Sequence, residues 1–231
     1  MNQIKKIRST SIWIFIVPFI GINVCLLLTT QFHSFDLIAH QYKIFSPFPY
    51  IDGGVSISRT ARYYPAYLIF KPAMFLTSFL LIKYWLFNKE VIQNFDKNHK
   101  HLKKIMFFGI GSAIALTIHS IFLGISFEND FYKFFRRVIM FVFIIFEITA
   151  QAYLVATLYS FKNELITFIN VKVLKLKLIL VSILIVVAVI SIPILGWPGN
   201  TFKFLKHALE WDYFLGVITF YLLTYFMWKK N

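Results

Sequence analysis

Hydrogen-bonding side chains inside long apolar segments are the residues of this chain that could do chemistry. Glu147 lies deep in one such segment, and Gln151 follows four residues later, which places both on one face of a helix. An ionisable group at the centre of a membrane helix costs roughly 2.5–3.5 kcal/mol, so it normally has a partner or a wet cavity. Arg136 and Arg137 precede Glu147 by about three helical turns and could reach partway towards it. Glu147 is therefore either a polar contact that fixes its helix to a neighbour or the proton-coupling carboxylate of a transporter.

A second set of polar residues shares one depth, near the ends of these apolar segments. Lys71 precedes Pro72, whose ring removes a backbone hydrogen bond and tends to kink a helix, so this point would border a pocket. The alternative is that Lys71 snorkels to lipid headgroups. Arginine binds phosphate through paired hydrogen bonds, so we expect a phosphate-bearing lipid headgroup here. The residues that we predict to bind it are Arg59, Arg62, Lys71, Arg136 and Arg137.

Histidines and carboxylates at the same depth suggest a different chemistry. His119 or His207 could act as a general base, with Glu210 or Asp212 orienting the imidazole. The chain would then be a membrane enzyme that modifies the acyl chains or headgroups of lipids. It contains neither a GxSxG nor a GxxxxGK[ST] motif, and we favour a protein with no catalysis or weak catalysis.

Metal and cofactor sites are not indicated by the spacing of the histidines and the cysteine. No two histidines are four residues apart, and His99 and His101 fall in a basic loop, so neither a zinc helix nor a bis-histidyl haem is predicted. Cys25 is the single cysteine, which excludes an intrachain disulfide and a thiolate cluster. We expect no metal and no cofactor, with Cys25 packed as a small apolar side chain.

The elements that position these residues follow from composition. Hydrophobic residues make up 58% of the 231 residues, and the mean hydropathy is +0.69, which is too apolar for a soluble domain. We predict an all-α polytopic membrane protein in which residues 1–231 form one bundle of six transmembrane helices. The first apolar run lacks a small-residue cleavage site and is expected to stay attached as a signal anchor. The predicted spans are about 11–30, 66–87, 105–123, 134–159, 178–195 and 207–228.

The charges of the loops predict an orientation. Fourteen of the 24 lysines and arginines fall at the chain ends and in the second and fourth loops, and six of the ten acidic residues fall on the other side. Because basic loops stay in the cytoplasm, both termini are predicted to be cytoplasmic, in a plasma or inner membrane. The long first loop, with His33, Asp36 and His40, then faces the opposite side. The net charge of +14 is explained by anionic headgroups, so no nucleic acid is expected.

A short segment before the second span carries a family resemblance. Ile57-Ser58-Arg59-Thr60-Ala61-Arg62-Tyr63-Tyr64-Pro65 resembles the I-S-x-T-G-x-x-P segment of the Frag/DRAM/Sfk-type family, with Ala61 in place of the glycine. Glu210-Trp211 is similar to the glutamate-tryptophan pair of that family's final helix. The family groups six-span proteins of GPI-anchor lipid remodelling with autophagy modulators. The resemblance implies six spans and a role linked to lipids.

The function that we predict from the sequence is binding or organising anionic lipid headgroups at the outer leaflet. A lipid-modifying enzyme is the first alternative. A transporter of small solutes coupled to protons through Glu147 is the second, although no inverted repeat is seen. The expected partners are membrane lipids, and a membrane-protein partner and the oligomeric state stay open.

Overall fold

Six long helices and two short ones form the described part of the chain, which in this computed structural model is residues 2–30, 48–62, 64–125, 130–196 and 201–229. The long helices are α1 (Asn2–Thr30), α4 (Ala66–Phe95), α5 (Leu102–Phe122), α6 (Asp130–Ser160), α7 (Val171–Gly196) and α8 (Lys203–Met227). The short helices are α2 (Pro49–Asp52) and α3 (Ile57–Thr60). These residues contain no strand, only an isolated bridge between Ile169 and Trp228, so the predicted all-α class is confirmed for them. His33, Asp36, His40, Tyr63 and Glu128 lie outside the described residues.

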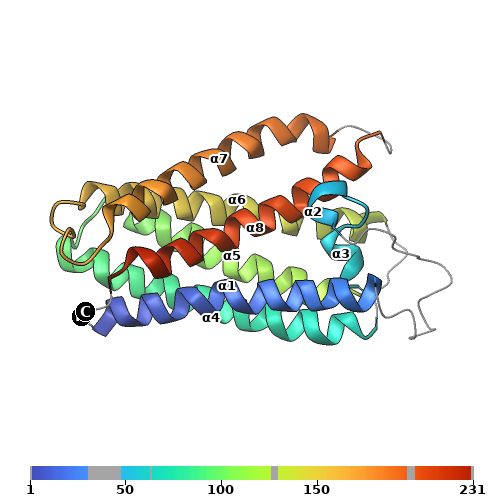
Figure 1. The fold of residues 1–231 in the computed structure, drawn as a ribbon, viewed down its shortest axis with the longest axis horizontal. Coiled ribbons are helices and arrows are strands. Elements are labelled where there is room, and N and C mark those ends of the chain that lie inside the picture. The colour runs from blue at the N-terminus through green and yellow to red at the C-terminus, as the bar shows by residue number, and fades with distance from the viewer. Residues whose placement is uncertain (1, 31–47, 63, 126–129, 197–200, 230–231) are drawn as a thin grey trace.

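The long helices run side by side and form a closed ring (Figure 1). Each one packs on the next in the chain from α4 to α8, and α1 packs on both α4 and α8. Successive long helices point in opposite directions, so α1 begins and α8 ends at the same end of the bundle, here called the termini end. The opposite end, which holds α2 and α3, is called the Arg62 end. The interior of this ring is therefore lined by side chains from several helices.

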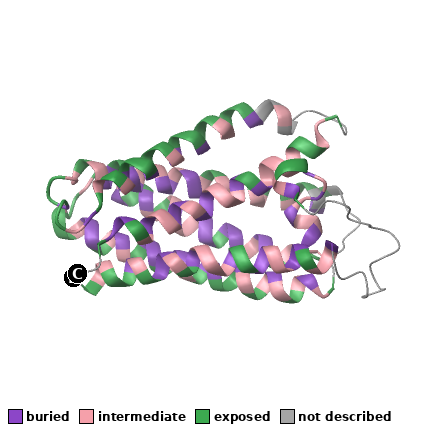
Figure 2. Ribbon diagram, in the orientation of Figure 1, coloured by how far each residue is buried: buried purple, intermediate pink, exposed green. Residues whose placement is uncertain are grey.

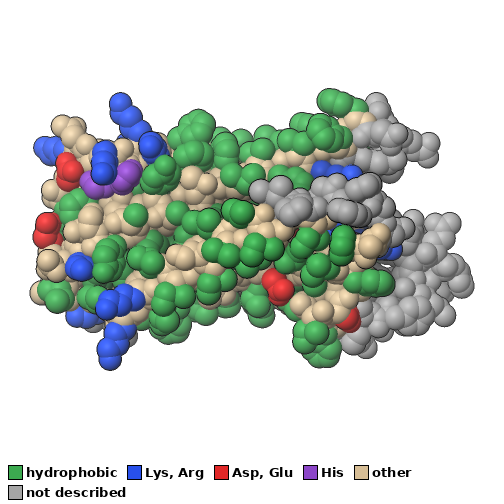
Figure 3. Space-filling model, turned by 90° about the horizontal axis from the view of Figure 1, so that it is seen from above, with side chains coloured by type: hydrophobic (Ala, Val, Ile, Leu, Met, Phe, Trp, Pro, Cys, Tyr) green, Lys and Arg blue, Asp and Glu red, His purple; other side chains and the backbone are tan. Residues whose placement is uncertain are grey.

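Five of the long helices are long and apolar enough to cross a membrane. They are α1, α4, α5, residues Phe134–Ser160 of α6 and residues Val171–Ser191 of α7. Hydrophobic side chains cover much of the surface along the bundle in Figure 3, as lipid contact requires. α8 is not among the five, and it carries Glu210 and Asp212 near its start. The sixth span and the cytoplasmic termini therefore stay predictions.

The helices extend beyond the predicted spans at the termini end. α1 begins at Asn2, α4 continues to Phe95 and α7 begins at Val171, each several residues outside the apolar run. The added residues include lysine, glutamate, glutamine and isoleucine, most of which form helix readily in water. Hydropathy marks where the hydrocarbon ends, whereas backbone hydrogen bonding continues past that boundary.

The helix α7 is the most exposed of the five candidate spans, with 22% of its apolar window buried. Its outward side chains, such as Ile183, Val186 and Val189, are exposed, and Figure 2 shows this helix largely in the exposed colour. Leu174, Val181 and Leu184 are buried on its inner face. The outer face of this aliphatic helix is therefore exposed, whereas its inner face packs in the bundle.

Residues 48–62 cover the start of α8 at the Arg62 end. The indole Nε1 of Trp211 donates to the carbonyl of Val55 at 2.8 Å, and His207 Nδ1 donates to the carbonyl of Gly53 at 2.9 Å. Gly53 ends α2 in the left-handed region, with φ at 60°. A Cβ at this position would lie 1.8 Å from the carbonyl oxygen of Phe204, so only glycine allows this approach.

Candidate functional site

Three nitrogen atoms at the Arg62 end are buried without a hydrogen-bond partner among the described residues. They are Nε of Arg62, Nε of Arg136 and Nδ1 of His119, and these three residues are called the cation cluster below. Arg136 lies within electrostatic range of both Arg62 and His119. Its guanidinium carbon is 5.7 Å from the centre of the Tyr132 ring. The segment before α4, the end of α5 and the start of α6 thus bring together residues that are far apart in the sequence.

Glu210 is the acidic residue next to the cation cluster. It lies within electrostatic range of Arg62, and its Oε1 accepts a hydrogen bond from the backbone N–H of Ser58 at 3.4 Å. Counting the described residues alone, one carboxylate beside two guanidinium groups leaves excess positive charge. Such a site can accept one further anionic group.

The remaining predicted headgroup residues lie around this cluster in different environments. Lys71 Nζ donates to the carbonyl of Ile121 at 3.2 Å, and Lys71 does not line the cavity described below. The helix α4 continues through Pro72, which is exposed. Arg137 is exposed, and Arg59 lies within electrostatic range of His207.

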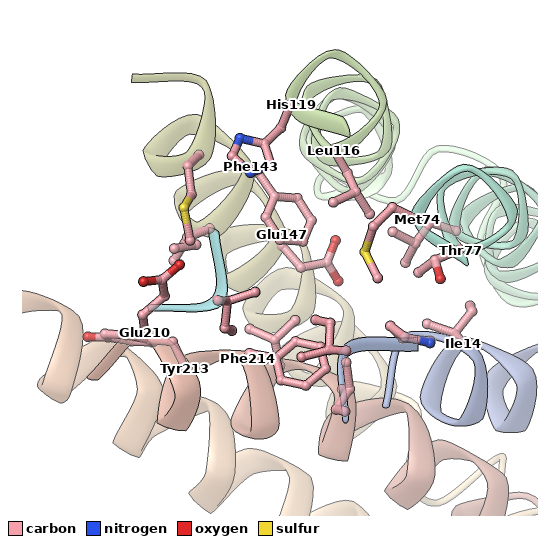
Figure 4. A pocket seen from close by; sticks show the side chains of 18 of the residues that line it. Ile14, Met74, Thr77, Leu116, His119, Phe143, Glu147, Glu210, Tyr213 and Phe214 are labelled. Atoms are coloured by element: carbon pink, nitrogen blue, oxygen red, sulfur yellow. The ribbon is translucent and has the colours of Figure 1, made fainter. Parts of the chain in front are cut away.

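A cavity of about 90 Å³ lies inside the ring of helices, and His119 of the cation cluster borders it (Figure 4). Its walls come from α1, α3, α4, α5, α6 and α8. His119 and Glu210 line it, whereas His207 and Asp212 do not. Of the four residues considered for acid-base chemistry, the structure therefore brings one histidine and one carboxylate to the same space.

Glu147 also lines this cavity, and its carboxyl group is held by three neighbours. Ser112 Oγ donates to Oε2 at 2.6 Å, Gln151 Nε2 donates to Oε1 at 3.0 Å, and the hydroxyl of Tyr221 donates to Oε1. The predicted pairing of Glu147 with Gln151 on one helix face is confirmed. None of these three hydrogen bonds comes from Arg136 or Arg137.

The hydrogen bonds of Ser112 allow Glu147 two protonation states. Ser112 Oγ is 2.8 Å from the carbonyl of Gly109 as well as 2.6 Å from Glu147. If Ser112 donates to Gly109, a protonated Glu147 can donate to Ser112, and if Glu147 is ionised, Ser112 donates to it. The site therefore stays hydrogen-bonded in both states.

A buried lysine was not identified from the sequence. Lys177 is fully buried, its Nζ donates to Thr224 Oγ1 at 2.6 Å, and it lies 3.9 Å from the centre of the Phe220 ring. The hydroxyl of Tyr84 lies 3.3 Å from the same Thr224 oxygen, and the Tyr84 ring packs on Tyr221. The predicted fifth span begins at residue 178, which places Lys177 outside it together with Lys172 and Lys175. Those two lysines are exposed, and only the helical phase of Lys177 distinguishes it from them.

The two histidines of the second loop, His99 and His101, lie at the termini end, whereas His119 lies near the opposite end of α5. His99 Nδ1 is 3.3 Å from Asp96 Oδ2, and its Nε2 is 3.2 Å from Thr157 Oγ1. Burial lowers the pKa of the His101 imidazole, and the charge of the neighbouring Lys100 lowers it further. Within the described ranges, no three His, Cys, Asp or Glu side chains form a group that could hold a metal ion.

Comparison with known proteins identifies a family. The model of the Frag1/DRAM/Sfk1/Cwh43P N-terminal domain family matches residues 9–229, which is nearly the whole chain. No curated protein and no solved structure matches the chain significantly.

Proposed function

We propose that this chain, a multi-pass membrane protein that belongs to the Frag1/DRAM/Sfk1/Cwh43P N-terminal domain family, binds the anionic headgroup of a lipid at the Arg62 end. Arg62 and Arg136 would hold the phosphate, with His119 donating from below. Arg59, Lys71 and Arg137 would add positive charge around it. The Arg62 end would be the outer side, as the loop charges predict.

The observation that carries this proposal is that three nitrogens of the cation cluster have no hydrogen-bond partner among the described residues. A buried donor without an acceptor costs about 1–3 kcal/mol, and charged donors cost more. Two guanidinium groups within electrostatic range of each other also repel. A phosphate between Arg62 and Arg136 would supply acceptors and remove the repulsion, and paired hydrogen bonds from arginine fit its geometry.

The test is lipid retention by the purified protein, measured by native mass spectrometry. We expect Arg62→Ala and Arg136→Ala each to reduce retained anionic phospholipid about tenfold or more, because a hydrogen bond to a charged group contributes about 1.5–3 kcal/mol. Lys71→Ala should have a smaller effect, since Lys71 already bonds a backbone carbonyl. Lys83→Ala is the control, because Lys83 is exposed on α4 against Phe79.

A second arm separates a lipid from free phosphate. Inorganic phosphate is titrated into the delipidated protein by calorimetry, and phosphatidylglycerol is supplied in mixed micelles. Binding of phosphatidylglycerol at a concentration where inorganic phosphate does not bind supports the proposal. Equal retention by wild type and the Arg136→Ala variant would reject it.

A lipid-modifying enzyme is the second candidate, because His119 and Glu210 line one cavity and His119 Nδ1 has no partner among the described residues. The His119 imidazole at the edge of that cavity could act as a general base. The lipid composition of cells carrying His119→Ala or Glu210→Ala is compared with that of a deletion strain. If both variants match wild type, the enzymatic candidate is excluded.

A further inference from the structure

The cavity below the cation cluster has an almost entirely apolar surface, although Thr77, Glu147 and Tyr221 line its inner part. At its inner part, Thr77 Oγ1 donates to the carbonyl of Ala73 at 2.7 Å, and the Tyr221 hydroxyl donates to Glu147. The Glu147 oxygens are in turn occupied by donors from the protein. These polar groups therefore bond to the protein itself and leave hydrocarbon as the surface that faces the cavity.

The side chains between the two ends are apolar. Figure 4 shows Ile14, Met74, Leu116 and Phe214 around the space towards which Glu147 points. A water molecule needs two to four polar partners in a buried site, and apolar cavities stay dry. A hydrocarbon ligand suits this lining better than water or a polar solute.

The length of the cavity matches one leaflet. Its lining residues on α8 extend from Glu210 to Tyr221, and eleven residues at 1.5 Å each span about 16 Å. Half of a hydrocarbon core roughly 30 Å thick is about 15 Å. The long axis of the helices is also the direction in which lipid chains extend.

We infer that this cavity binds one acyl chain of the lipid whose anionic headgroup lies at the cation cluster. The inference rests on the proposed function and adds to it the part of the ligand that enters the protein. The cavity is narrow over this length and has room for one chain at most, so the second chain of a phospholipid stays in the bilayer. His119 and Glu210 mark the boundary between the headgroup and the chain.

The closed inner end predicts selection by chain length. Glu147 and Tyr221 are fixed to each other by a hydrogen bond, and Leu81 is buried beside them. A chain that is too long would have to bend or withdraw. Since burying one methylene contributes about 0.8 kcal/mol, each methylene that no longer fits should reduce relative binding about fourfold.

The experiment uses the full-length protein and an equal mixture of dilauroyl, dimyristoyl, dipalmitoyl and distearoyl phosphatidylglycerol. Bound species are resolved by mass in native mass spectrometry. Ile218→Phe narrows the cavity from α8, so we expect its profile to shift towards shorter chains. Leu81→Ala lengthens the cavity at its inner end, so we expect the opposite shift, which misfolding cannot produce.

Two exposed positions supply the controls. Val189→Phe on α7 adds the same ring to the outer surface, where Val189 is 61% exposed, and Leu76→Ala on α4 removes the same atoms from an exposed side chain. Both should keep the wild-type chain-length profile. Identical profiles for wild type, Ile218→Phe and Leu81→Ala would overturn the inference.

The Arg136→Ala variant, run in the same mixture, separates this inference from the proposed function. Loss of phosphatidylglycerol in Arg136→Ala without any shift in the cavity variants rejects the acyl-chain site alone. Shifts in the cavity variants with full retention by Arg136→Ala reject the headgroup proposal. Loss of phosphatidylglycerol in Arg136→Ala, together with opposite shifts of the chain-length profile in Ile218→Phe and Leu81→Ala, supports both the headgroup proposal and the acyl-chain site.

Discussion

At the residue scale, the buried polar groups divide into those that the sequence could identify and those that it could not. Glu147 and Gln151 were identified because polar side chains in the middle of an apolar run are conspicuous in the sequence. Lys177 was missed because it lies near two exposed lysines at the edge of an apolar run. Tyr84 and Thr224, which complete its surroundings, are residue types that occur in many membrane helices without a special role.

Replacing Lys177 should show that its amine is not needed for stability. Lys177→Met keeps a long side chain against Phe220 and removes a buried group that is costly to desolvate, and such replacements are often neutral or stabilising by about 1–4 kcal/mol. Thr224 keeps its bond to the carbonyl of Phe220 and its contact with Tyr84. We expect an equal or higher Tm in detergent, measured by thermal unfolding.

Removing the acceptor instead of the lysine should have the opposite effect. Thr224→Val leaves the Lys177 amine without its oxygen partner, which should cost about 1–3 kcal/mol and lower Tm. Lys175→Met, at the exposed position two residues earlier, is the matched control. A lower Tm for Lys177→Met than for Thr224→Val would mean that Lys177 contributes an interaction beyond the two contacts described.

At the element scale, glycines set how closely the helices approach. A Cβ at Gly109 would lie 2.4 Å from the buried ring of Trp85 on α4, and one at Gly111 would lie 2.7 Å from the Phe146 ring on α6. Both glycines thus lie where an aromatic ring of a neighbouring helix approaches the α5 backbone closely. The distances from α5 to α4 and to α6 therefore depend on glycine, which has no side chain, at positions 109 and 111.

Two alanine substitutions separate packing from helix propensity. Gly109→Ala should lower stability by about 1–3 kcal/mol, because the Trp85 ring is fully buried and cannot move aside. Gly216→Ala brings its Cβ to 2.6 Å from the end of the flexible Leu184 side chain. That side chain can adjust, and alanine gains about 1 kcal/mol of helix propensity, so Tm should change little. Equal losses of Tm in the two variants would contradict this explanation.

The sequence predicts five of the membrane-spanning helices well and the last one, α8, less well. Five apolar runs correspond to five candidate spans, because a length of about 20 apolar residues is required by the bilayer itself. The α8 run differs because Glu210 and Asp212 shorten its apolar part. Segment 48–62 was expected to be a loop, and its docking on Trp211 depends on single hydrogen bonds that no periodicity reveals.

At the scale of the whole molecule, the ring closure and the cavity could not be predicted. The sequence placed the cations and the carboxylates at one depth, but depth alone does not say which residues meet. Arg62 and Arg136 become neighbours only because α4, α5 and α6 follow one another around the ring. The cavity depends on how side chains from several helices fill the interior, and one sequence does not contain that information in a local pattern.

The predicted topology can be tested with the native cysteine left in place, because Cys25 is buried in α1. Ile51→Cys at the Arg62 end and Asn98→Cys at the termini end both lie at exposed positions. With six spans and cytoplasmic termini, a membrane-impermeant maleimide should label Ile51→Cys in intact cells. It should label Asn98→Cys only after permeabilisation. Labelling in the reverse order would show that the orientation predicted from the loop charges is wrong.

The contact between α1 and α8 also has a consequence for biosynthesis. α8 is the last of the six long helices to leave the ribosome, and until it is inserted Glu147 lacks the hydroxyl of Tyr221 and the ring stays open between α1 and α7. A nascent bundle of five helices would therefore expose the Glu147 carboxyl group through this opening. Insertion of α8 would close this opening and complete the cavity in a single late step, so quality control in the cell should recognise a chain truncated before Lys203 as incomplete.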